Sequence, residues 1–225
     1  MENKSRILCI SDIHGEYDKF KKLLSKVNYD KNTDQLILLG DYVDRGPKNI
    51  DTLMLVKKLT QQGAIALIGN HEQMMVDCIN SMINKDNNRI IDLYLECGGF
   101  ETYNELINLS NNKLSEIREF VISLPYMHII DKYIFVHAGV DSKKQISENS
   151  SDVFLWARKE FIFNKAYEGF TVIFGHTPTP YLNVNKEYAI WYDTIHNDKI
   201  CIDCGCVYGG KLACLDLTNK KEYYI

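Results

Sequence analysis

Residues 36–47 of the chain read LILLGDYVDRGP, and this stretch decides how the rest of the sequence is interpreted. The apolar run predicts a short buried strand that ends at Gly40, because runs bounded by glycine and proline are typical of such strands. Asp41, Asp44 and Arg45 follow it. In a parallel sheet, ligands bind beyond the carboxyl ends of the strands. Two anions and a cation there indicate a cation or phosphate site, and a polar turn with a local ion pair is the alternative.

The segments around this stretch alternate between strands and helices. We expect strands at residues 6–11 and 64–68 and amphipathic helices at 16–25 and 50–59. This alternation favours βαβ units with parallel strands. Residues 72–124 are polar, Asn-rich and helical in pattern, and we expect them to form a helical insertion.

The second half of the chain changes to strands. The pattern predicts strands at 127–130, 133–136 and 172–174, a helix at 153–163, and a meander of strands without a helix at 188–225. Strands and helices alternate in the first half of the chain, and strands predominate in the second half. This order indicates an α/β fold of two sheets packed together under helices.

Composition excludes several classes of protein. The net charge of -4 over 225 residues provides no basic surface for nucleic acid, so local cations or a metal must attract any phosphorylated ligand. No apolar run is long enough to span a bilayer, and the first residues lack a signal-peptide pattern. The seven cysteines fit reduced thiols better than a disulfide framework, which predicts a cytoplasmic protein.

Five of the predicted strands end in loops of one kind. Each loop carries Asp, Asn or His, which are ligands suited to divalent transition metals, beside a glycine that permits a sharp turn. The loops are DIHG (12–15), GDYVDRG (40–46), GNHE (69–72), VHAG (136–139) and FGH (174–176). One such loop is a weak signal, but five at successive strand ends predict a metal centre.

With these motifs in this order, the chain resembles the phosphoprotein phosphatases within the calcineurin-like metallophosphoesterases, especially the small bacterial and lambda-phage-type serine/threonine phosphatases. The resemblance covers nearly the whole chain and includes IDCGCVYGGKL at 202–212, which is similar to the closing strand pair of that family. It implies a β-sandwich of two mixed sheets flanked by helices, as one domain of residues 1–225 with the helical insertion at about 72–124.

The resemblance implies two divalent metal ions with one shared ligand. Asp41 would bridge the ions, at the separation of about 3.5–4 Å usual in two-metal hydrolases. The first ion would be held by Asp12, His14 and Asp41, and the second by Asp41, Asn70, His137 and His176. Manganese is the first expectation, with iron or zinc as alternatives, because mixed oxygen and nitrogen ligands accept all three.

The resemblance also implies four catalytic residues. His71 would be the general acid, oriented by Asp44, whose carboxylate favours the imidazolium form. Arg45 and Arg158 would bind phosphate oxygens with their planar guanidinium groups. Arg45 as an ion-pair partner of Asp44, and Arg158 as an exposed helix residue, are the alternatives.

These residues together predict a metal-dependent phosphomonoesterase. Phosphoserine and phosphothreonine proteins are the expected substrates, with phosphotyrosine as a further one; neither nucleic acid nor membrane is an expected partner. A bis(5'-nucleosyl)-tetraphosphatase is the alternative, which stacking aromatics in the insertion, such as Tyr94, Phe100 and Tyr103, would favour unless they belong to the core. A non-catalytic phosphate-binding scaffold is more remote, because none of the family's metal residues is missing.

Overall fold

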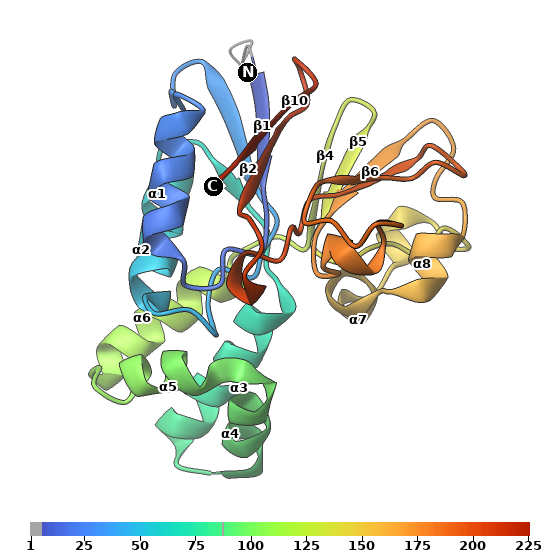
Figure 1. Cartoon of the computed structure of the whole chain (residues 1–225). Coiled ribbons are helices and arrows are strands. Elements are labelled where there is room, and N and C mark those ends of the chain that lie inside the picture. The colour runs from blue at the N-terminus through green and yellow to red at the C-terminus, as the bar shows by residue number, and fades with distance from the viewer. Residues whose placement is uncertain (1–5, 87) are drawn as a thin grey trace.

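Two five-stranded mixed sheets form the centre of the molecule in the computed structural model, which describes residues 6–86 and 88–225 (Figure 1). The first sheet has the order β10-β9-β1-β2-β3 and the second has the order β4-β5-β6-β8-β7. The strands of the first sheet are β1 (Arg6–Ile10), β2 (Asp34–Leu38), β3 (Ile65–Ala66), β9 (Ala213–Asp216) and β10 (Lys221–Tyr224). Those of the second are β4 (Met127–Ile130), β5 (Tyr133–Val136), β6 (Thr171–Phe174), β7 (Trp191–Tyr192) and β8 (Lys199–Cys201).

The predicted βαβ units are confirmed in the first sheet. β1, β2 and β3 are parallel, and the chain between them forms α1 (Tyr17–Lys26) and α2 (Asn49–Thr60). Ile10 pairs with Leu38 at the last register position, so β1 and β2 end side by side. In the second sheet β5, β6 and β8 are also parallel to one another, so the carboxyl ends of these three strands lie side by side at one edge of that sheet.

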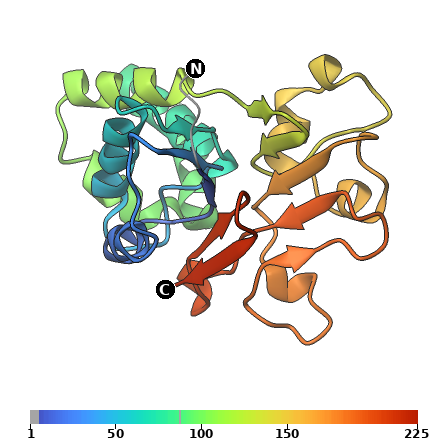
Figure 2. The same ribbon diagram turned by 90° about the horizontal axis from the view of Figure 1, so that it is seen from above.

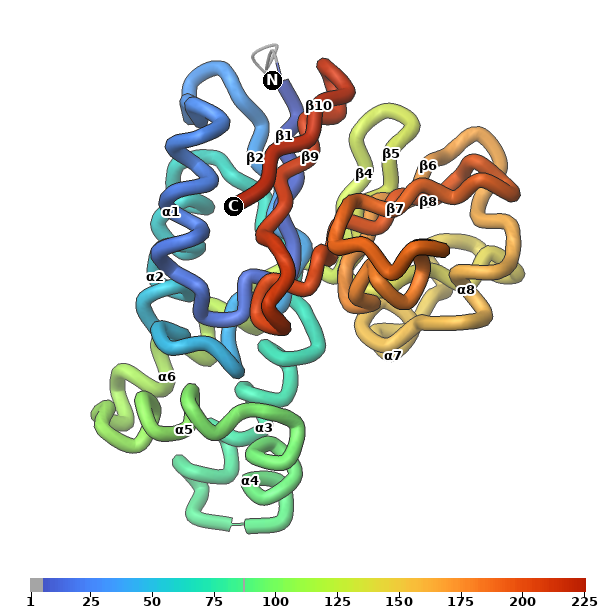
Figure 3. Tube along the Cα trace, viewed as in Figure 1, coloured from blue at the N-terminus to red at the C-terminus, as the bar shows by residue number. Residues whose placement is uncertain are grey.

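The expected meander of residues 188–225 is wrong. β7 and β8 belong to the second sheet, where β8 is parallel to β6, whereas β9 and β10 are antiparallel strands of the first. A short 3-10 helix, Cys206–Tyr208, lies where the chain passes between the sheets (Figures 2 and 3). An alternating pattern predicts that a segment is a strand, but burial on both sheets decides which neighbour it pairs with.

The helical segment begins slightly earlier than expected and packs at one end of the first sheet (Figure 1). It comprises α3 (Asn70–Asn84), α4 (Asn88–Tyr94), a π-helical turn (Leu95–Gly99), α5 (Phe100–Leu106) and α6 (Asn111–Ile122). None of its helices, nor any other in the part of the chain that the structure describes, is long and apolar enough to cross a bilayer.

The single helix expected at 153–163 is also wrong, because the chain breaks it into α7 (Ser151–Trp156) and α8 (Lys159–Phe163). Ala157 is extended, with ψ 139°, and Arg158 is not helical. Phe154 and Phe161 are buried on either side of the break, so the apolar periodicity continues through it. Periodicity alone therefore cannot detect this break.

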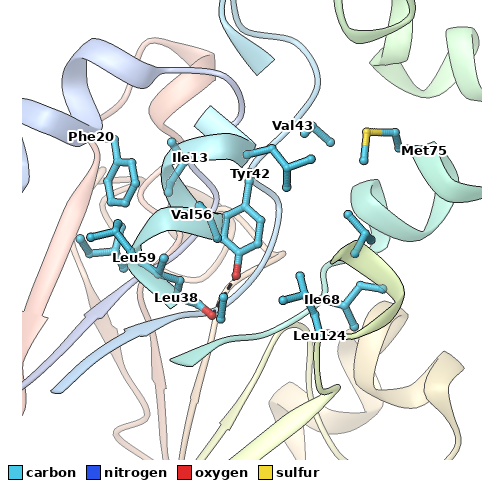
Figure 4. Packing of buried hydrophobic residues seen from close by; sticks show 14 of the residues in the cluster. Ile13, Phe20, Leu38, Tyr42, Val43, Val56, Leu59, Ile68, Met75 and Leu124 are labelled. Atoms are coloured by element: carbon cyan, nitrogen blue, oxygen red, sulfur yellow. Dashed lines mark hydrogen bonds between the residues drawn. The ribbon is translucent and has the colours of Figure 1, made fainter. Parts of the chain in front are cut away.

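Apolar side chains fill three layers, one between the sheets and one outside each. Cys9, Ile37 and Leu39 of the first sheet share a cluster with Phe135 and Ile173 of the second. In the layer under α1 and α2, Tyr42 lies among aliphatic side chains (Figure 4), and its hydroxyl donates to the carbonyl of Leu67 at 2.7 Å. This buried tyrosine fixes the loop that begins at Gly40.

Candidate metal centre

Residues of four of the five predicted loops line one pocket of about 710 Å³, and the fifth loop, 136–139, contacts them through His137. All five loops follow the carboxyl ends of β1, β2, β3, β5 and β6, which the parallel pairing brings to the same edge of the sandwich. The predicted site residues that line the pocket are Asp12, His14, Asp41, Arg45, Asn70, His71, Arg158 and His176. His137 and Asp44 are fully buried and contact this set from behind.

One group of residues that could hold a metal ion is Asp41, His137 and His176. His137 Nε2 lies 3.4 Å from Asp41 Oδ1 and 2.8 Å from Asn70 Oδ1, and His176 Nδ1 lies 2.9 Å from the same Asn70 oxygen. His137 Nδ1 lies 2.9 Å from the carbonyl of Leu39, which places its proton there and points the Nε2 lone pair into the group. Converging buried acceptors of this kind fit a divalent cation.

A second group that could hold a metal ion consists of His14, Asp41 and His71. His14 Nδ1 donates to the carbonyl of Val43 at 2.8 Å, so its Nε2 is the acceptor, 3.6 Å from Asp41 Oδ2. Asp41 belongs to both groups, and its role as a bridge between two ions stays a prediction. Asp12 lines the same pocket but lies outside both groups, and its carboxylate accepts a hydrogen bond from the backbone N–H of His176 at 3.1 Å.

Burial determines the electrostatics of the centre. It raises the pKa of Asp41 well above its usual value, and the nearby carboxylates of Asp12 and Glu72 raise it further. Burial also lowers the pKa of His137 to about 3, so the imidazole is neutral at physiological pH. Neutral imidazole is the form that binds metal, and a cation would stabilise the ionised carboxylates.

His71, a member of the second group, also pairs with Asp44. His71 Nδ1 lies 2.6 Å from Asp44 Oδ2, and His71 Nε2 faces the pocket, 4.0 Å from Asp41 Oδ2. Burial lowers the pKa of His71 to about 3, with the Arg45 guanidinium acting in the same direction, and burial raises the pKa of Asp44 to about 7. The geometry allows either a proton donor or a metal ligand at Nε2, and the donor role stays a prediction.

Both predicted phosphate arginines reach the pocket. Arg45 Nη1 donates to His14 Nε2 at 2.7 Å, and within the described residues the structure records no ion pair between Arg45 and Asp44. Arg158 occupies the break between α7 and α8, where Nη1 lies 3.3 Å from Thr177 Oγ1. The alternative of an exposed helix arginine holds only in part, because Arg158 is exposed but lies at the break between the two helices and lines the pocket.

Comparison with known proteins identifies the family. The model of the calcineurin-like phosphoesterase family matches residues 5–217. The chain belongs to the calcineurin-like phosphoesterase family. The predicted fold and the predicted family are thereby confirmed.

The relatives of this calcineurin-like phosphoesterase carry names of more than one kind. Serine/threonine-protein phosphatase 2 of Salmonella typhimurium is 28% identical over 92% of the chain and 90% of its own length. A symmetrical bis(5'-nucleosyl)-tetraphosphatase of Dechloromonas aromatica is 30% identical over 58% of the chain, and the match spans only 42% of that relative. A crystal structure provisionally named a diadenosine tetraphosphatase superposes with a TM-score of 0.72 and 19% identity, covering 100% of this chain and 94% of that one.

Two residues of this phosphoesterase have site roles that the sequence reasoning missed. Glu72 accepts hydrogen bonds from the backbone N–H groups of Asp41 and Tyr42, each at 2.7 Å, and so holds the loop of residues 40–46. Asp203 is buried and lines the pocket. Asp203 lies shortly after β8, and the parallel pairing of β8 with β6, which was not expected, brings it to the pocket. An acidic residue directly beyond a strand was the feature of the sequence that could have identified it.

Proposed function

We propose that this phosphoesterase hydrolyses phosphoserine and phosphothreonine in proteins, with phosphotyrosine as a further substrate. The observation that carries the proposal is the gathering of two metal-binding groups, His71 and two arginines at one pocket. Two divalent cations, manganese first and iron or zinc as alternatives, would supply the Lewis acidity that makes hydroxide available near neutral pH.

Each side chain of the site would have its own role in the reaction. Arg45 and Arg158 would bind the phosphate oxygens, because guanidinium groups match phosphate geometry. The oxygen of hydroxide would form a bond to phosphorus while the bond from phosphorus to the leaving oxygen breaks. His71 would give its Nε2 proton to that leaving oxygen and take up at Nδ1 the proton that it shares with Asp44, so that the imidazole stays neutral. Asp44, held against Nδ1, would also orient the ring.

A protein substrate is supported by the relative that matches along nearly its whole length, which is named a protein phosphatase. A second candidate, hydrolysis of dinucleoside polyphosphates, is favoured by aromatic side chains at the pocket. Trp156, Tyr181, Tyr188 and Tyr208 line it, and Tyr181 is 83% exposed, so a nucleobase could stack there. Tyr94 of the helical insertion is only 2% exposed and offers no such surface.

The deciding experiment is turnover by the manganese-loaded protein on phosphoserine, phosphothreonine and phosphotyrosine peptides, with diadenosine tetraphosphate at equal concentration. We expect the phosphoserine and phosphothreonine peptides to be preferred, and Tyr181→Ala to leave their hydrolysis within a few-fold of the parent. A preference for the dinucleotide, lost in Tyr181→Ala, would replace the proposal with the second candidate.

Two substitutions separate metal binding from proton transfer. Asp41→Asn should lose bound metal and activity together, because Asp41 belongs to both metal groups. His71→Asn should keep the metal, measured by elemental analysis, and lose about 10²–10⁴ in turnover. Loss of metal in His71→Asn would make His71 a ligand, and unchanged turnover would remove it from the chemistry.

A further inference from the structure

The carboxylate of Asp44 is held by two hydroxyl groups from the helical insertion. Tyr94 Oη and Thr102 Oγ1 each donate to Asp44 Oδ1 at 2.5 Å, while Asp44 Oδ2 faces His71. Thr102 Oγ1 also accepts the backbone N–H of Asp44 at 3.0 Å. All three residues are buried, with exposures of 2% or less, so these contacts are shielded from bulk solvent.

The same stretch, residues 94–102, also contacts the backbone of the next site residue. The carbonyl of Gly98 accepts the N–H of Arg45 at 3.1 Å. Asp44 and Arg45 have φ of 74° and 69°, a conformation that residues other than glycine adopt only when their surroundings enforce it. Residues 94–102 provide contacts that stabilise this conformation.

Tight packing fixes residues 94–102 themselves. A Cβ on Gly99 would lie 2.5 Å from the ring of Tyr94, and a Cβ on Gly98 would lie 3.1 Å from Cγ of Arg45. The tyrosine ring therefore lies directly on the backbone that follows it. Its hydroxyl has little freedom to point anywhere except at Asp44.

We propose that residues 94–102 are a positioning element for the leaving-group side of the reaction, in which Tyr94 and Thr102 orient Asp44 and Asp44 orients His71. This inference rests on the proposed role of His71. Without the two hydroxyl groups the carboxylate can rotate, and His71 Nε2 then points away from the leaving oxygen. The proton that moves from Nε2 to that oxygen matters most when the leaving group is a poor one, so the loss depends on the substrate.

The test compares two aryl phosphates that differ only in the leaving group, 4-nitrophenyl phosphate and phenyl phosphate, with manganese-loaded protein. Tyr94→Phe and Thr102→Val should each lower kcat on phenyl phosphate about 10–100-fold, the range found for residues that orient a functional side chain. On 4-nitrophenyl phosphate the fold-decrease in kcat should be less than a third of the fold-decrease on phenyl phosphate. KM should not change for either substrate. Thr102→Ser, which keeps the hydroxyl group, should have the same kcat as the parent protein on both substrates.

Tyr103→Phe is the matched control, because it removes a tyrosine hydroxyl from the same helical insertion at a side chain that packs against the core. It should behave as the parent on both substrates. In a His71→Asn background, Tyr94→Phe should cause no further loss on phenyl phosphate, since the residue that it orients is absent.

Equal losses on both substrates, or an additive loss in the His71→Asn background, would overturn the proposal and leave Tyr94 and Thr102 with a structural role. In that case His71→Asn alone should still discriminate between the two leaving groups, and the proposed function stands. If His71→Asn shows no discrimination, the general-acid role fails and this inference fails with it.

Discussion

Six residues of the site adopt a backbone conformation that is unfavourable for side chains other than glycine, as do residues elsewhere such as Asn28 and Lys85. Asp12, His14, Asp41, Asp44, Arg45 and His176 all have positive φ, between 46° and 74°. Such conformations cost of order 1–3 kcal/mol each and persist only where the surroundings enforce them. Glu72 helps to enforce them, because its carboxylate accepts hydrogen bonds from the backbone N–H groups of Gly69 and Asp41.

We therefore expect Glu72→Gln to lower the free energy of unfolding by more than about 2 kcal/mol. A carboxamide keeps one acceptor oxygen and turns an NH₂ toward backbone donors, and each buried N–H without an acceptor costs about 1–3 kcal/mol. Urea unfolding measures the change. Glu101→Gln, at an exposed position of the insertion, should change stability by less than about 0.5 kcal/mol. A Glu72→Gln protein as stable as the parent would show that Glu72 does not hold the loop.

At the scale of elements, a buried lysine of β8 links the second sheet to the end of α8. Lys199 of β8 is 1% exposed and forms ion pairs with Asp193, at 2.8 Å, and with Asp198. Its ammonium group also donates to the carbonyl of Asn164, directly after α8. Although burial opposes ionisation, Lys199 and nearby backbone N–H groups lower the pKa of Asp193 to about 2.

This depressed pKa gives a pH-dependent prediction. The folded pKa is below the unfolded value of about 3.9, so the stabilisation is complete above about pH 5 and is lost as the pH falls through about 2. Asp193→Asn should lower stability by about 3 kcal/mol near pH 7 and by progressively less below pH 4. Denaturant unfolding at several pH values measures this. Asp18→Asn, in an exposed ion pair with Lys48, should cost less than about 1 kcal/mol, and a pH-independent Asp193→Asn effect would contradict the assignment.

At the scale of the whole molecule, the candidate metal centre joins the two sheets. Asp41 and Asn70 follow strands of the first sheet, whereas His137 and His176 follow strands of the second. A cation bound by all four side chains would connect both halves of the sandwich. Ligands that bind only the folded state stabilise it by about 2.7 kcal/mol at a hundredfold excess over Kd.

Manganese should therefore raise the Tm of the parent protein, and a chelator should lower it again. Asp41→Asn should show no manganese-dependent shift, whereas His71→Asn should keep the shift. Differential scanning calorimetry at fixed protein concentration measures these shifts. A parent Tm that does not respond to manganese would argue against a metal that bridges the sheets.

The amino-acid sequence by itself determined the βαβ order, the five polar strand ends and the residue types of the centre. These features are local: apolar runs bounded by glycine specify where strands end and which side chains follow. Tertiary structure alone decided that β8 pairs with β6, which brings Asp203 to the pocket, and that α7 and α8 separate at Arg158. It also decided that Tyr94 and Thr102 contact Asp44 from 50 and 58 residues further along the chain. Such contacts depend on how buried surfaces pack together, and short-range sequence patterns do not specify that packing.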